Sequence, residues 1–265
     1  METDVELATR VAKLAGQLLL ELRESIGSFD RSDIATRKKL KDEGDRAANE
    51  LIVTALTAAR PGDAILTEEA FDEDNRDTAR RVWIIDPLDG TSEYGLGRAD
   101  FAVHIALWDR EATTPEKLVA GAVDLPAQQI TRTTADVSAH PPPLAADRPI
   151  RIVVSRSRPP QIARSGIEKL ARAMAEAGIT DMGVEVINYG SVGAKVNEVL
   201  SGRAEAYLHD TGFYEWDVAA PLAVAQHYGL TATHIDGEHI TFNHRPPWVR
   251  SLTVCLPQLT RFLLA

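Results

Sequence analysis

Apolar residues near the amino terminus recur at helical spacing. They lie three or four positions apart and therefore share one face of a helix: Leu7, Val11, Leu14, Leu18 and Leu22. This stripe predicts a long amphipathic helix that begins near Thr3 and stops at Gly27. A second helical pattern covers about residues 45–60, after a polar connection that contains residues 37–41, and Pro61-Gly62 ends it.

Short apolar runs predict strands, and two of them end abruptly at acidic residues. Residues 64–67 are followed by Glu68-Glu69, and residues 82–85 are followed by Asp86-Pro87. We therefore expect two strands that each deliver carboxylates at one end. Further strands are predicted at residues 101–108 and 119–123.

The second half of the chain begins after a polar stretch, residues 131–149, that contains three consecutive prolines. Such a stretch fits a surface connection, so we divide the chain into one domain at 1–130 and another at 131–265. Beyond it, strands are predicted at 150–154, 184–187 and 204–208, and helices at 167–174, 191–202 and 217–229. This alternation predicts a layered α/β architecture, and Asp236-Gly237 predicts the turn of a terminal hairpin.

Composition and charge narrow the range of partners. The chain has 265 residues, of which 44% are hydrophobic, and this is enough to build a substantial core. Its formal net charge of −10 disfavours binding to long nucleic acids. An acidic protein can still take a small anionic substrate where bound cations invert the local potential, so clustered carboxylates are of particular interest.

The single cysteine, Cys255, cannot close an intrachain disulfide and fits a reducing compartment. The first residues are acidic, and no apolar run approaches the roughly 20 residues that span a bilayer. We therefore expect a cytoplasmic protein that does not engage a membrane. The seven histidines show no HxxxH spacing, so we interpret each as a surface or core residue rather than a metal ligand.

Residues 83–91, WIIDPLDGT, carry the strongest chemical signal. Asp86 and Asp89 follow a buried strand, and with the Leu88 carbonyl they can converge on one cation. Hard oxygen ligands of this kind favour Mg²⁺. Gly90 and Thr91 could present backbone N–H groups to a phosphate at the start of a helix.

Each of these residues also has an ordinary structural explanation. Asp-Pro and Asp-Gly are common turn dipeptides, and Glu68 fits a solvated loop acid. Asp217 fits a helix N-cap, and Asp45 fits an acid in the first turn of a helix. Spacing alone does not bring Glu68, Asp45 and Asp217 together.

The order DPLDGT at 86–91, with Glu68-Glu69 upstream and WDVAA at 216–220 downstream, resembles the inositol monophosphatase superfamily over nearly the whole chain. The resemblance implies an inositol monophosphatase-like α/β/α/β/α sandwich in which the second domain completes the metal and substrate site. It implies that the cofactor is Mg²⁺, with two or three ions bound. By the same resemblance, their ligands are Glu68, Asp86, the Leu88 carbonyl, Asp89 and Asp217. It also implies that Asp45 and Thr91 activate the attacking water.

Within the superfamily, the sequence GTSEY at 90–94 resembles the CysQ-type bisphosphate nucleotidases. This implies a Li⁺-sensitive phosphatase that removes the 3′-phosphate of 3′-phosphoadenosine 5′-phosphate, with the 5′-phosphosulfate as a related substrate. Ser191 and Lys195 match positions near the substrate, beside Gly90 and Thr91. Residues 155–158 resemble a nucleotidase SRSH motif, but Arg158 stands in place of the histidine. The resemblance is compatible with a homodimer.

Other functions stay open at this point. The same metal site serves inositol monophosphatases, fructose 1,6-bisphosphatases and enzymes of broad substrate range. A protein that keeps the fold as a nucleotide or metal sensor without catalysis is a rival of a different class, which the presence of both Asp45 and Thr91 disfavours.

Overall fold

The computed structural model describes residues 2–27, 32–69 and 74–264, and the fold is built on two five-stranded sheets. The first sheet has the order β1-β2-β3-β4-β5, with only β1 and β2 parallel. Its strands are β1 (Ala64–Thr67), β2 (Arg81–Asp89), β3 (Ala102–Asp109), β4 (Leu118–Leu125) and β5 (Ile130–Thr133).

The second sheet has the order β10-β12-β8-β6-β7, in which β6 is parallel to both of its neighbours. Its strands are β6 (Ile150–Ser155), β7 (Val184–Tyr189), β8 (Ala206–His209), β10 (Thr231–Thr233) and β12 (Leu252–Cys255). A separate short pair joins β9 (Phe213–Tyr214) to β11 (Trp248–Val249).

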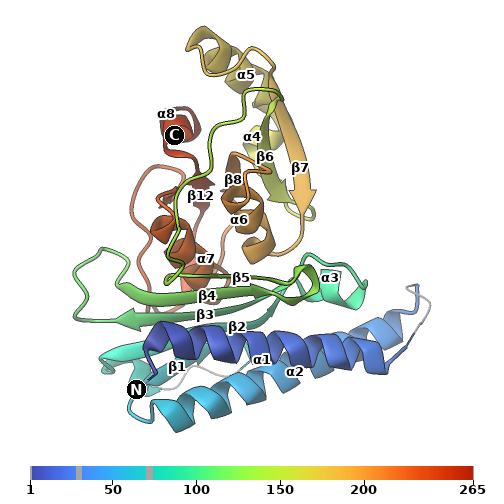
Figure 1. Cartoon of the computed structure of the whole chain (residues 1–265), viewed down its shortest axis with the longest axis vertical. Helices are drawn as coiled ribbons and strands as arrows, with labels where there is room; N and C mark the ends of the chain where they lie inside the picture. Colours follow the sequence, from blue (N-terminus) through green and yellow to red (C-terminus); the bar gives the residue numbers. More distant parts are fainter. Residues whose placement is uncertain (1, 28–31, 70–73, 265) are drawn as a thin grey trace.

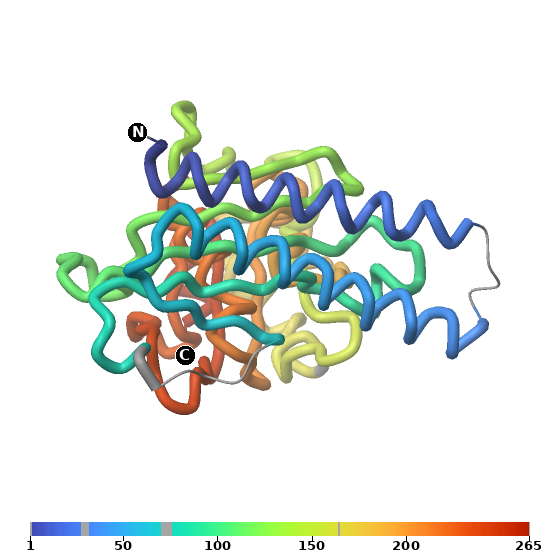
Figure 2. The backbone as a smooth tube through the Cα atoms, turned by 90° about the horizontal axis from the view of Figure 1, so that it is seen from below, coloured from blue at the N-terminus to red at the C-terminus, as the bar shows by residue number. Residues whose placement is uncertain are grey.

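The helices separate and cover these sheets in layers (Figure 1). Helices α1 (Asp4–Ser25) and α2 (Ile34–Ala59) cover one face of the first sheet and lie side by side across it, as Figure 2 shows. Helices α6 (Val192–Leu200) and α7 (Glu215–His227) lie between the two sheets. The short helices α4 (Gln161–Ser165), α5 (Ile167–Glu176) and α8 (Thr260–Leu263) complete the outer layer. The predicted α/β/α/β/α sandwich is therefore confirmed.

The first helix matches the prediction, whereas the second begins earlier than predicted. In α1, Thr3 and Glu6 form a capping box, in which each side chain accepts the other residue's backbone N–H. Helix α2 begins at Ile34 rather than near Asp45, so the predicted polar connection at 37–41 is wrong. Asp33 caps the helix, and its first turns are basic and largely exposed, so they lack the apolar periodicity on which the prediction depended.

Three further boundaries differ from the prediction. Strand β5 occupies the start of the stretch that we interpreted as a surface connection. Helix α7 begins at Glu215, two residues before Asp217. The Asp236-Gly237 turn does not close a hairpin, because β10 pairs with the distant β12 rather than with the residues just after the turn. The division of the chain into domains at 130/131 stays a prediction.

A buried polar network joins the connection between β1 and β2 to the start of α7. The Arg76 side chain is fully buried and donates to Asn243 Oδ1 at 2.5 Å and to the His244 carbonyl at 2.9 Å. The equally buried Glu215 carboxylate accepts the backbone N–H groups of Asn243 and His244 at 2.7 and 2.8 Å. Residues 243–244 are thus held from both sides by buried charges. None of the helices in the described parts of the chain is long and apolar enough to cross a membrane.

We expect Arg76→Met to lower the free energy of unfolding by about 3–5 kcal/mol, because it removes one member of a buried charged network. Chemical denaturation at neutral pH measures this. The control is Arg80→Met, since Arg80 is exposed and its ion pairs with Asp109 and Glu111 lie at the surface. That variant should lose less than about 1 kcal/mol. Equal losses would contradict a special role of the buried network.

Candidate active site

An irregularity in β2 places two carboxylates on one face of the first sheet. Asp86 pairs with His104 and Asp89 pairs with Ala102, so three steps along β2 oppose two steps along β3. In a regular strand, residues three apart point to opposite faces. The extra residue of this bulge lets both aspartates face the second half of the chain, while Leu88 packs into the core beneath α1 and α2.

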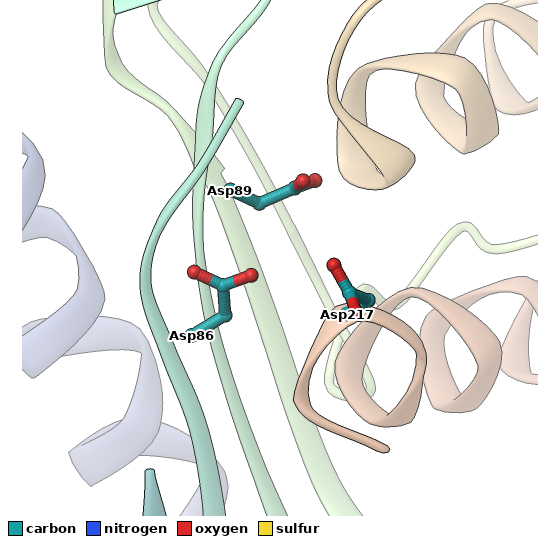
Figure 3. A group of neighbouring side chains, drawn as sticks. All are labelled: Asp86, Asp89 and Asp217. Atoms are coloured by element: carbon teal, nitrogen blue, oxygen red, sulfur yellow. The ribbon is translucent and has the colours of Figure 1, made fainter. Parts of the chain in front are cut away.

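A third carboxylate reaches the same place from α7. Asp217 lies in the first turn of that helix, where its Oδ2 accepts the Tyr214 backbone N–H at 2.8 Å. Ligand atoms of Asp86, Asp89 and Asp217 lie within 4.8 Å of one another. Figure 3 shows the three side chains, two from β2 and one from the helix, directed toward one another. Residues far apart in the sequence therefore form one acidic cluster.

The Asp89 carboxylate also anchors the start of α6. Ser191, the N-cap of α6, donates its hydroxyl to Asp89 Oδ2 at 2.5 Å, and the Gly193 N–H donates to the same oxygen at 3.1 Å. The His104 Nε2 lies 3.4 Å from that oxygen. A Cβ at Gly193 would lie 2.4 Å from His104 Nε2, so only glycine permits this approach of α6 to β3.

Burial and mutual repulsion disfavour the charged forms of these acids. Burial raises the pKa of Asp86 well above its ordinary value, and the charges of Glu68, Asp89 and Asp217 raise it further. The pKa of Asp217 is raised to about 8 by burial and by Asp89. Glu68 follows β1, and its pKa is raised to about 7 by burial and by Asp89 and Glu69. A bound cation would stabilise the charged forms and so oppose these shifts.

Asp45 lies in α2, on the opposite side of the acidic cluster from the second sheet. Burial, followed by the charges of Glu69 and Glu68, raises its pKa to about 8. Its Oδ1 is buried and has no hydrogen-bond partner within the described residues. A Cβ at the preceding Gly44 would lie 3.0 Å from the Tyr94 ring, which shows how closely α2 and α3 (Thr91–Gly95) approach beside Asp45.

The turn into α3 begins at Gly90. This glycine has a φ of +88°, and a Cβ there would lie 3.0 Å from the Asp100 carbonyl and 3.2 Å from Ser191 Cβ. The position therefore admits glycine alone, for backbone conformation and for space. Thr91 is the first residue of α3.

A buried lysine faces the acidic cluster from α6. Lys195 is 2% exposed, its ammonium donates to the Gly190 carbonyl, and it lies 5.1 Å from the centroid of the Tyr207 ring. Burial lowers the pKa of Lys195 to about 8, against the opposing effect of Asp89 and Asp217. Lys195 thus places a buried positive charge beside the acidic cluster.

The structure thus brings Asp86, Asp89 and Asp217 together, with Glu68 close enough to raise the pKa of Asp86 and of Asp217. The roles assigned to these residues, to the Leu88 carbonyl and to Asp45 and Thr91 stay predictions. His104, interpreted as an ordinary core residue, is buried against a carboxylate of the cluster. His104 lies opposite Asp86 in the neighbouring strand, a register that the sequence pattern does not give.

Comparisons with known proteins agree with this geometry. Residues 1–261 match the Inositol monophosphatase family. The chain belongs to that family. A 3′-phosphoadenosine 5′-phosphate phosphatase of Mycobacterium leprae is 41% identical, with 99% of this chain and 92% of the relative covered. The phosphatase of the same name from Mycobacterium tuberculosis is 39% identical over 94% of this chain and 88% of its own length.

Among solved structures, CysQ from Bacteroides thetaiotaomicron superposes with a TM-score of 0.76 at 24% identity, covering 97% of this chain and 98% of its own. At this identity the likeness concerns the fold. The mycobacterial relatives confirm the predicted resemblance to the bisphosphate nucleotidases of the family.

We expect the metal-free protein to lose stability as pH rises from about 5 to 8. The raised pKa values of Glu68, Asp86 and Asp217 mean that the folded state binds protons more tightly than the unfolded chain. Their contribution is therefore full at low pH and is lost as pH rises through the folded-state values. Asp217→Asn should flatten this dependence of Tm, measured in a chelating buffer, and Mg²⁺ should raise the Tm of the wild type at pH 8. A variant with the wild-type pH slope would contradict the assignment.

Proposed function

We propose that the protein is a phosphoric monoester hydrolase that removes the 3′-phosphate of 3′-phosphoadenosine 5′-phosphate, with the 5′-phosphosulfate as a second substrate. The observation that carries the proposal is the cluster of buried carboxylates from β2 and α7. The names of the mycobacterial relatives, which match almost the whole chain, supply the substrate. The substrate is a small molecule. The enzyme acts in the cytoplasm, and its single, unpaired cysteine is compatible with a reducing compartment.

Glu68, Asp86, the Leu88 carbonyl, Asp89 and Asp217 would hold two or three Mg²⁺ ions. The donors fit such ions, because they are hard oxygens, the Asp86 and Asp89 side chains are buried, and the charged forms of Asp86 and Asp217 need a counter-charge. When bound, the ions would neutralise the ester phosphate and stabilise the entering and leaving oxygens of an in-line displacement.

Asp45 and Thr91 would position the attacking water. The buried Asp45 Oδ1 lacks a partner within the described residues and is available to accept a proton, which its raised pKa favours. The Thr91 hydroxyl, at the start of the neighbouring α3, would orient the water toward phosphorus. No covalent phosphoenzyme is required by this arrangement.

The substrate phosphate would lie against the backbone at Gly90 and Thr91, where α3 begins. Lys195 would supply a positive charge from α6. The Ser191 hydroxyl is committed to Asp89 and to the Ala194 N–H, so it would act on substrate chiefly through the placement of α6.

We expect 3′-phosphoadenosine 5′-phosphate to be preferred over inositol 1-phosphate and fructose 1,6-bisphosphate by at least tenfold in kcat/KM, or about 1.4 kcal/mol in transition-state binding. Phosphate release with Mg²⁺ measures this, and millimolar Li⁺ should inhibit it. A preference for the inositol or sugar phosphate would overturn the substrate while keeping the reaction class. Absence of all three activities would favour a sensor.

Asp89→Asn should lower kcat/KM by more than about 100-fold, because changes to groups that merely support a metal ligand already cost 10–100-fold. The matched control is Asp124→Asn, which alters another buried carboxylate, hydrogen-bonded to Thr131 at 2.7 Å. That variant should keep its activity within a few fold at a temperature where both proteins are folded. Normal turnover by Asp89→Asn would refute the assignment of Asp89.

A further inference from the structure

An exposed pair of aromatic rings lies beside the acidic cluster. Tyr214 and Trp248 are 44% and 46% exposed, and they are the only aromatic side chains among the large exposed hydrophobic residues of the described chain. They pair across β9 and β11, with ring centroids 5.2 Å apart in an edge-on arrangement. The Tyr214 ring also stacks on Trp216 at 4.5 Å.

This aromatic pair is fixed in place by its surroundings. A Cβ at Gly212, which has a φ of +76°, would lie 2.3 Å from Trp248 Cζ2, so the indole ring covers a position that admits only glycine. The Tyr214 ring stacks on Trp216 and meets Trp248 at right angles, and it remains 44% exposed. Two large rings are therefore held at the surface without being buried by the fold, at a cost in hydrophobic free energy.

The pair is directly connected to a proposed metal ligand. The Tyr214 backbone N–H donates to Asp217 Oδ2 at 2.8 Å, and Trp216 immediately precedes Asp217. A positive charge lies on the same turn, because Arg158 Nη1 donates to the Gly212 carbonyl at 3.4 Å. The Arg158 charge lowers the pKa of Asp217 and of Lys195, so Arg158 also lies near the site.

We propose that the exposed pair Tyr214 and Trp248 binds the nucleobase of the substrate, which stacks on the face of one ring and contacts the other ring edge-on, because the two rings are perpendicular, and that Arg158 binds its 5′-phosphate. The inference rests on the proposed function, since only a ribose separates a base from the 3′-phosphate held at the acidic cluster. Stacking requires an aromatic face and no particular base edge. The surface therefore explains selection of nucleotides over inositol and sugar phosphates, and it predicts tolerance toward the identity of the base.

The first experiment compares 3′-phosphoadenosine 5′-phosphate with its abasic analogue, 1,4-anhydroribitol 3,5-bisphosphate, which has both phosphates and no base. In Tyr214→Leu and Trp248→Leu, the ratio of kcat/KM for the nucleotide to that for the analogue should fall about tenfold or more, mainly through KM. Tyr214→Phe and Trp248→Phe should restore the ratio. Met182→Ala, at an exposed hydrophobic residue elsewhere, should not alter it. An unchanged ratio in both leucine variants would overturn the proposal.

A binding measurement separates this proposal from the proposed catalytic function. By calorimetry, the wild type should bind adenosine 5′-phosphate at least about tenfold more tightly than ribose 5-phosphate, and the leucine variants should bind the two alike. Arg158→Gln should weaken both ligands and preserve their difference. Equal affinity of the wild type for the two would overturn the stacking surface even if the enzyme is active. If no ester is hydrolysed but the base still adds affinity, the proposed function fails and the stacking surface stands.

Size-exclusion chromatography tests whether a second copy of the chain, rather than a nucleobase, covers Tyr214 and Trp248. If the wild type is a dimer that Trp248→Leu converts to a monomer while the kinetic ratio stays unchanged, the surface is a subunit interface and the proposal is wrong. A variant with the oligomeric state of the wild type and a reduced ratio would support it.

Discussion

Repulsion among buried carboxylates is the constraint on which the site depends. Ligand atoms of Asp86, Asp89 and Asp217 lie within 4.8 Å of one another, and the charge of Glu68 raises the pKa of Asp86 and of Asp217. Charged forms at such distances are unfavourable in a buried environment unless cations or protons compensate. The fold assembles this arrangement from a bulged strand and the first turn of a helix, so the stability of two layers offsets the repulsion. Such a site is prepared for cations before any substrate arrives.

Asp89 has a second role, because it joins the two sheets. Its Oδ2 accepts hydrogen bonds from Ser191 and Gly193, at the start of a helix that packs against strands of both sheets. The network of Arg76 and Glu215 makes a comparable connection to α7, which carries Asp217. The aspartates of β2 and Asp217 of α7 are therefore each held in place by polar contacts close to them. Small local shifts at either contact would change the spacing of the whole cluster.

The sequence predicted the periodic elements well and the irregular ones poorly. The stripe of α1 and the strand that leads to Asp86 were evident, because apolar spacing reflects burial directly. The start of α2 was missed, since basic exposed turns carry no such spacing. The apolar pattern also did not predict the bulge between Asp86 and Asp89, although this bulge places both carboxylates on one face of the sheet. The meeting of β2 with Asp217 followed only from the resemblance, because no local rule relates positions so far apart. To predict that His104 lies beside the acidic cluster, one would have to know which residue opposes Asp86 in the neighbouring strand.

The unequal surroundings of the two Asp89 oxygens bear on which ion the protein selects. Oδ2 already accepts two hydrogen bonds from α6, so coordination through both oxygens would disrupt the contact that seats this helix. A metal ion held by Asp89, as proposed, would then leave Oδ2 to these two hydrogen bonds. Single-oxygen coordination suits a small octahedral ion, whereas Ca²⁺ commonly takes a carboxylate through both oxygens and accepts more ligands. If Asp89 holds a metal ion as proposed, the serine that caps α6 would disfavour the larger ion through this shared oxygen.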